Sequence, residues 1–153
     1  MTRNVRLFIN TFEQWRQYLV MAPVKYEETD LQGDAAGIKD NAEMLTDKNV
    51  SVVQYNAKAM KKRIKAQIVG DALHELGHYI QRLPYKTNSE KVLSEYSAER
   101  FALSMLKTFY PELYLEKIKQ MQAQMKDTKI WETDSIYKAA YEKIEEYSER
   151  AAD

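Results

Sequence analysis

Cysteine is absent from this 153-residue sequence, which excludes disulfide bonds, a thiolate nucleophile and a cysteine zinc cage. Histidine is scarce, with 2 copies, so any site that needs imidazole must use these two residues. Charge of one sign is also missing, because 23 Lys and Arg residues balance 23 Asp and Glu residues. No overall field therefore attracts the chain to nucleic acid or to an anionic membrane, and we expect neither as a partner.

Long hydrophobic runs are missing as well. No segment approaches the roughly 20 apolar residues that a membrane-spanning helix needs. Charged residues interrupt the first 19 positions, where a signal peptide would carry an apolar core, so we expect a cytoplasmic protein. Hydrophobic residues make up 44% and charged residues 30% of the chain, which is typical of globular proteins. The length fits a single domain over residues 1–153.

The N-terminal part has short strand-like patterns. Apolar and polar residues alternate over residues 5–9, which predicts a strand, and a capping-box pattern predicts a helix over residues 11–20. The acidic segment 27–47 contains glycine and is expected to be mostly loop, with one strand around residues 37–45. Residues 50–55 are β-branched and aromatic, which makes them the best strand candidate.

The C-terminal part has helical spacing from residue 57 onward. One helix ends by residue 83 because Pro84 follows it, and its expected apolar stripe consists of Val69, Leu73, Leu76 and Ile80. A second capping box at residues 87–90 opens a helix to about residue 110, and Pro111 begins another to about residue 125. A last helix is expected to carry Asp134 as its cap and Ile136, Ala140, Ile144 and Tyr147 on one face. The predicted fold class is α+β, with a strand-rich N-terminal part and a helical C-terminal part.

The chain contains one HExxH motif, His74-Glu75-Leu76-Gly77-His78. On a helix, residues four apart stand on one face about 5–6 Å apart, so both imidazoles can reach one zinc ion at about 2.0–2.1 Å. Zinc lowers the pKa of a bound water towards about 7, and Glu75 can accept its proton and pass it to a leaving amine. The alternative is an accidental pair on a surface helix, and it is disfavoured because both histidines of the chain lie in the motif.

A catalytic zinc usually takes three protein ligands, and the third must be a carboxylate here because no other histidine or cysteine exists. Glu95 and Glu99 both lie on the apolar face of the next predicted helix, where a carboxylate must be paired or bound to metal. We predict that Glu95 is the ligand and that Glu99 accepts a hydrogen bond from a ligand histidine. Glu90 is the reserve ligand. The alternative is that the two carboxylates form ion pairs, with Arg100 or Lys91.

The two motifs together resemble a known group of enzymes. His-Glu-Leu-Gly-His followed by Glu95-Tyr96-Ser97-Ala98-Glu99 resembles the gluzincin clan of zinc metallopeptidases. Within that clan, residues 95–102 look like the ImmA/IrrE family of bacterial and phage enzymes, with Ser97 and Glu99 departing from its usual pattern. The resemblance covers about residues 73–106. It implies a zincin-like fold, a Zn²⁺ cofactor held by His74, His78 and Glu95, and a protein or peptide substrate such as a regulator.

The resemblance also implies that strand 50–55 is the edge strand that aligns the substrate backbone. Two other functions use the same residues: a zinc amidase or deacylase, and a zincin-fold binding or regulatory module with a structural metal. An open fourth coordination position would favour catalysis, and a closed site of four protein ligands would favour structure. The developing oxyanion would need a Tyr or Arg donor. Tyr79, Tyr85, Tyr96 and Tyr110 are near the motif in sequence, but core or surface packing is the favoured interpretation of each, and none is assigned. The basic run over residues 58–65 is interpreted as a solvated helix face.

Overall fold

The computed structural model describes residues 1–153 except 31–35, 41–49, 127–137, 141 and 145–153. In chain order the elements are α1 (Arg3–Tyr18), β1 (Lys25–Glu28), β2 (Ala36–Asp40), β3 (Ser51–Tyr55), α2 (Ala57–Lys61), α3 (Lys65–Gln81), α4 (Asn88–Phe109) and α5 (Pro111–Lys126). The predicted α+β class is confirmed, and the protein is mostly helical with one three-stranded sheet.

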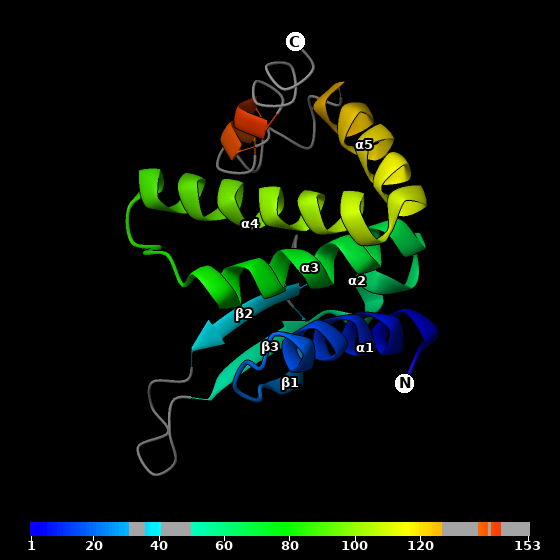
Figure 1. Ribbon diagram of the computed structural model, residues 1–153, viewed down its shortest axis with the longest axis vertical. Helices are drawn as coiled ribbons and strands as arrows, with labels where there is room; N and C mark the ends of the chain where they lie inside the picture. The colour runs from blue at the N-terminus through cyan, green and yellow to red at the C-terminus, as the bar shows by residue number, and fades with distance from the viewer. Residues whose placement is uncertain (31–35, 41–49, 127–137, 141, 145–153) are drawn as a thin grey trace.

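Helix α3 lies at the centre of the structure (Figure 1). It packs against α4 on one side and against α1 and β2 on the other, and α5 contacts both α3 and α4. The buried residues of α3 come from nearly all around the helix, from Ala66 to Tyr79. The HExxH motif therefore lies on a helix whose position is fixed by every neighbouring layer.

Helix α1 replaces the strand predicted over residues 5–9, and that prediction was wrong. Thr2 caps the helix by accepting a hydrogen bond from a backbone N–H of the first turn. The helix predicted over residues 11–20 is the C-terminal part of α1. Thr11 lies inside it, and its hydroxyl donates to Leu7 O at 2.8 Å. The buried side chains recur every three or four residues and are Val5, Phe8, Thr11, Phe12 and Trp15. A helical period explains this burial and a strand period does not.

The sheet has the order β1-β3-β2. Strand β3 confirms the strand predicted over residues 50–55, but it pairs on both sides, parallel with β1 and antiparallel with β2. Val53 is opposite Tyr26 on one side and Ile38 on the other. The prediction that this segment is the edge strand was therefore wrong. Val52 and Val53 are both buried, and consecutive buried β-branched residues are typical of a strand covered on both faces.

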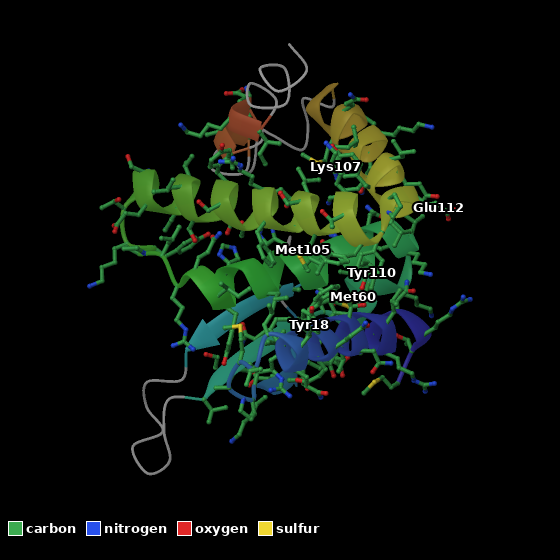
Figure 2. All side chains as sticks on the ribbon, in the orientation of Figure 1. Tyr18, Met60, Met105, Lys107, Tyr110 and Glu112 are labelled. Carbon is green, nitrogen blue, oxygen red and sulfur yellow. The ribbon has the colours of Figure 1, made fainter. Side chains whose placement is uncertain are left out.

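The helical region is interrupted between α2 and α3, where the sequence predicted continuous helical spacing. The side-chain amide of Asn4 donates to Met60 O at 2.7 Å and to Arg63 O at 3.0 Å. These bonds satisfy carbonyl groups that a continuing helix would otherwise use. Met60 itself is fully buried beside α1 (Figure 2), so the break anchors the start of α3 to α1.

The remaining helices agree largely with the helices predicted from the sequence. Helix α3 ends before Pro84, and the capping box at residues 87–90 is present at the start of α4. Three members of the predicted α3 stripe are buried, but Ile80 is 37% exposed. Tyr110 ends α4, and its hydroxyl accepts a hydrogen bond from Trp15 Nε1 at 2.9 Å, which ties the α4–α5 junction to α1 (Figure 2).

Two predictions extend beyond the described residues. The strand expected around residues 37–45 corresponds to β2 where the structure describes it, and residues 41–49 lie outside that part. Of the last predicted helix, residues 138–140 and 142–144 are helical, and Ala140 and Ile144 are buried. The other three residues named for it, Asp134, Ile136 and Tyr147, lie outside the described residues.

Truncation of Phe8 tests the helical assignment of α1. Phe8 is 0% exposed, so Phe8→Ala should lower the free energy of unfolding by about 3–5 kcal/mol, as other buried Phe truncations do. Phe109→Ala removes the same atoms from a residue that is 53% exposed and should cost clearly less. Denaturant unfolding of both variants measures the difference, and equal losses would contradict the burial of Phe8 by α1.

Candidate metal centre

The site begins with a close contact between α3 and α4. A Cβ atom at Gly77 would lie 3.1 Å from both Cα and O of Ala98 and 3.1 Å from Phe101 Cδ1. Only glycine allows the two backbones to approach this closely. The buried face of α4 is lined near this point by small residues, Ser94, Ala98 and Ala102. The contact places the polar residues of that face directly against the HExxH face of α3.

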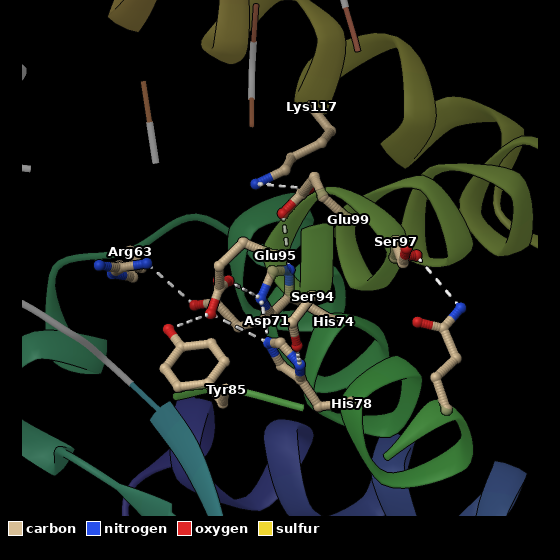
Figure 3. Close-up of polar contacts among 11 residues, drawn as sticks. Arg63, Asp71, His74, His78, Tyr85, Ser94, Glu95, Ser97, Glu99 and Lys117 are labelled. Carbon is tan, nitrogen blue, oxygen red and sulfur yellow. Dashed lines mark hydrogen bonds and ion pairs between the residues drawn. The ribbon is translucent and has the colours of Figure 1, made fainter. Parts of the chain in front are cut away.

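The contact brings His74, His78 and Glu95 together (Figure 3). The two Nε2 atoms are 3.1 Å apart. One oxygen of Glu95 lies 2.8 Å from His74 Nε2, and the other lies 3.2 Å from His78 Nε2. Among the described residues, this is the group of His, Asp and Glu side chains whose atoms lie close enough to hold a metal ion. The sequence predicted these same three residues as the metal ligands.

The other ring nitrogen of each histidine faces an oxygen on α4. His74 Nδ1 lies 2.8 Å from Glu99 Oε2, and His78 Nδ1 lies 3.1 Å from Ser94 Oγ. When Nδ1–H donates to these oxygens, the lone pair of each Nε2 is left for a metal ion. Glu99 therefore lies where it can accept the expected hydrogen bond from His74. Ser94 takes the same position beside His78.

The spacing of the three side chains fits a tetrahedral ion. Ligand atoms bound at about 2.0–2.1 Å around a tetrahedral zinc lie about 3.3 Å from one another. The two Nε2 atoms are 3.1 Å apart and His78 Nε2 is 3.2 Å from Glu95 Oε1, both close to this value, and His74 Nε2 is nearer, 2.8 Å from Glu95 Oε2. Two imidazoles and one carboxylate also form a donor set that suits zinc. The residues present therefore fit a divalent metal.

Charges in the cluster stabilise one another despite its burial. Burial alone would lower the pKa of His74, but hydrogen bonds to Glu95 and Glu99 overcome this effect and raise the pKa well above its ordinary value. Burial alone would raise the pKa of Glu95, but hydrogen bonds and charges from the two histidines hold it far below its usual range. The positive charge favoured on His74 and the negative charge favoured on Glu95 thus stabilise each other.

Glu75 differs from the other carboxylates of the site. Its side chain is buried, and Oε2 has no hydrogen-bond partner among the described residues. Desolvation raises the pKa of Glu75 to about 7, against the lowering effect of the histidine charges. A carboxyl group with this pKa exchanges protons readily near neutral pH. The unsatisfied oxygen of Glu75 thus lies on the residue that follows His74, one of the residues that could hold a metal ion.

Two residues of the site, Ser94 and Lys117, were missed in the sequence. Ser94 faces His78, and the Lys117 ammonium lies 3.8 Å from Glu99 Oε1. Ser94 could have been found from its place beside Glu95 on the same helix, whereas no spacing in the sequence relates Lys117 to the motif. Tyr85 was one of four tyrosines noted near the motif, and the structure shows that its hydroxyl donates to Glu95 Oε1 at 2.9 Å.

Lys117, a cation that the ion-pair alternative did not name, forms an ion pair with Glu99 at 3.8 Å. The Lys91 ammonium instead lies 5.7 Å from the ring centre of Tyr85. The reserve ligand Glu90 serves another purpose, since it accepts a hydrogen bond from Thr87 N at 2.9 Å in the capping box of α4.

Comparison of the chain with protein-family models, with curated proteins and with solved structures finds no match. No described helix combines the length and the apolar character that a membrane crossing requires.

Substitution of two glycines on α3 tests the role of the α3–α4 contact. Gly77→Ala should separate the helices and weaken zinc affinity by about 10–100-fold, the usual effect of displacing groups that support a ligand. Gly70→Ala is the matched control, because its Cβ would meet the nearest atom at an ordinary 3.5 Å. That variant should keep its metal affinity, and its free energy of unfolding should rise by up to about 1 kcal/mol because alanine favours the helix more than glycine does. Chelator competition and denaturant unfolding measure both effects, and similar behaviour of the two variants would contradict the close contact.

Alanine substitutions separate the roles of Glu95 and Glu99. Glu95→Ala removes an atom that would bind the metal and should leave the protein nearly metal-free in competition with a chelator. Glu99→Ala removes only the acceptor of His74 Nδ1 and should reduce affinity by about 10–100-fold. Glu90→Ala should not change affinity. The opposite order for Glu95 and Glu99 would assign the ligand to Glu99, and loss of metal in Glu90→Ala would restore the reserve ligand.

Proposed function

We propose that this protein is a zinc-dependent metallopeptidase that hydrolyses a peptide bond of a protein or peptide substrate, with His74, His78 and Glu95 as zinc ligands. The observation that carries the proposal is the convergence of both Nε2 atoms and the Glu95 carboxylate at one point, with both Nδ1 atoms facing oxygens on α4. The gluzincin resemblance of the sequence adds the zincin-like fold and the reaction class.

Zinc at this site would supply a Lewis acid that polarises the scissile carbonyl and lowers the pKa of water. Glu75 then accepts the proton of the attacking water and returns it to the amine that leaves. Its pKa of about 7 suits both steps, because the group can be deprotonated before attack and protonated afterwards. Burial keeps the carboxyl group away from bulk water, so the proton is transferred within the site.

Tyr85 is the tyrosine best placed to donate a hydrogen bond to the developing oxyanion. Its hydroxyl already contacts Glu95, and its ring lies edge-on to His78 with 6.4 Å between centroids. The other candidates are engaged elsewhere: the Tyr79 hydroxyl donates to Ala22 O, Tyr110 accepts from Trp15, and Tyr96 packs in a separate apolar cluster. Tyr85 is also exposed, so a substrate can reach its side of the site.

Strand β2 is the strand suited to align a peptide substrate. In the described sheet it pairs with β3 and it contacts α3, so a substrate added as a strand beside it would lie near the motif. A peptide backbone paired with β2 would run beside the helix that carries the motif (Figure 1). This arrangement favours a peptidase over an amidase or deacylase, which would not need an extended backbone partner.

The first experiment measures metal content. Purified protein should contain about one zinc per chain, as expected for a single site with two histidines, and His74→Ala should contain almost none. Elemental analysis measures both. Absence of metal from the wild-type protein after zinc loading, or equal zinc in His74→Ala, would overturn the metal site.

Glu75→Gln tests catalysis separately from metal binding. The amide has the same shape as the carboxylate but cannot carry the proton, so the variant should keep its zinc and its thermal stability and lose hydrolysis. Zinc-loaded wild type and variant are incubated with a peptide library, and cleavage products are identified by mass spectrometry. The zinc-loaded His74→Ala protein serves as the control for contaminating proteases. Cleavage by Glu75→Gln at the wild-type rate would assign the base to another group. Absence of cleavage by the zinc-loaded wild type would favour a binding module.

A further inference from the structure

Lys117 is a buried lysine that neither the motif nor the proposed reaction uses. It lies on α5, and 7% of its side chain is exposed. Its Cε and Cδ atoms lie 3.5 and 3.6 Å from the position that a Cβ at Gly70 would occupy. These are ordinary van der Waals distances, so the stem of Lys117 lies against α3 beside Gly70. Lysine is rarely buried to this degree unless it is paired.

The ammonium of Lys117 faces the oxygen of Glu99 that the histidine does not use. Glu99 Oε2 lies 2.8 Å from His74 Nδ1. Glu99 Oε1 has no hydrogen-bond partner among the described residues, and Lys117 Nζ lies 3.8 Å from it. The three side chains form a row from α5 through α4 to α3 that ends at a predicted zinc ligand (Figure 3).

A carboxylate buried this deeply is costly without a cation. Asp71 also lies in the field of Lys117, but it has its own partner, Arg63, at 2.9 Å. Glu99 therefore depends on Lys117 more than Asp71 does. With the ammonium in place, Glu99 is an anionic acceptor that holds the His74 ring with Nε2 towards the other ligands.

We propose that Lys117 is a positioning residue of the metal centre, and that the docking of α5 thereby sets the affinity of the site for zinc. This inference rests on the proposed zinc site. It assigns a function to α5, which the HExxH and Glu95 motifs do not include. By linkage, zinc binding must in turn stabilise the docking of α5 on α3 and α4.

Matched variants of two lysines on α5 test the proposal. Lys117→Met keeps the length of the stem and removes the charge, and Lys117→Arg keeps a charge. Lys119→Met removes an exposed lysine from the same helix. Zinc affinity is measured by competition with a chromophoric chelator. We expect a loss of about 10–100-fold in Lys117→Met, wild-type affinity in Lys119→Met, and substantial recovery in Lys117→Arg.

A double variant shows whether Lys117 acts through Glu99. In a Glu99→Gln background the carboxylate is gone, so adding Lys117→Met should weaken zinc binding little further. Absorption spectra of the cobalt-loaded proteins report ligand geometry directly and should change in Lys117→Met but not in Lys119→Met. Full additivity of the two losses, or unchanged affinity in Lys117→Met, would overturn the role of Lys117.

The wild-type protein offers a measurement that does not depend on the folding of any variant. Zinc should slow amide hydrogen exchange in α5 as well as in α3 and α4, with little effect in α1. Protection of α3 and α4 without α5 would contradict the coupling and leave the zinc site intact. Failure of the wild type to bind zinc would instead overturn the proposed function, so the two failures are distinguishable.

Discussion

The close approach of α3 and α4 at Gly77 and Ala98 is the contact on which the site depends. It is set by backbone rather than by side-chain packing, since a single Cβ at Gly77 would meet Ala98 Cα and O at 3.1 Å. At this separation the side chains that project between the two helices are His74, Glu95 and Glu99, and each reaches another within hydrogen-bond distance. A wider separation would leave the same groups buried without partners.

The charges of the cluster show why these residues must be considered together. Removing one member leaves the others buried without full compensation, and an unpaired buried charge is strongly destabilising. The histidines keep the carboxylates ionised, and the carboxylates keep His74 protonated. A divalent cation bound by this group would interact with the same oxygens and nitrogens. Polar groups so placed inside a protein contribute less to stability than apolar packing would, which points to a functional reason for their presence.

Sequence reasoning succeeded where the information was local. The i, i+4 histidines, the capping box of α4 and the carboxylates on its buried face all follow from helical period and chemistry within one element. It failed for α1, because an alternating run over residues 5–9 is too short to distinguish a strand from a helix. The burial of Phe8 and Phe12 could decide between them only once the neighbouring layers were known.

Sheet order and contacts between distant elements were beyond the same reasoning. The composition of β3 predicts a strand, but its central place depends on β1 and β2, which carry weak strand signals of their own. Tyr85 follows the motif closely, but nothing in the sequence singles it out among the tyrosines nearby, and Lys117 reaches the site from α5, where no sequence neighbour indicates a metal centre. Such residues become visible only when the packing of three helices is known.

The state of Glu75 gives the strongest argument for catalysis over a structural metal. A structural zinc site is closed by four protein ligands, whereas the cluster in the described residues has three members. A structural site also gains nothing from a fourth carboxyl group that is buried with an unsatisfied oxygen, because such a group costs free energy. Desolvation brings the pKa of that group to about 7, the range in which it can both accept and donate a proton. The proposed peptidase reaction would give this costly group a use, as the carrier of a proton from the attacking water to the leaving amine.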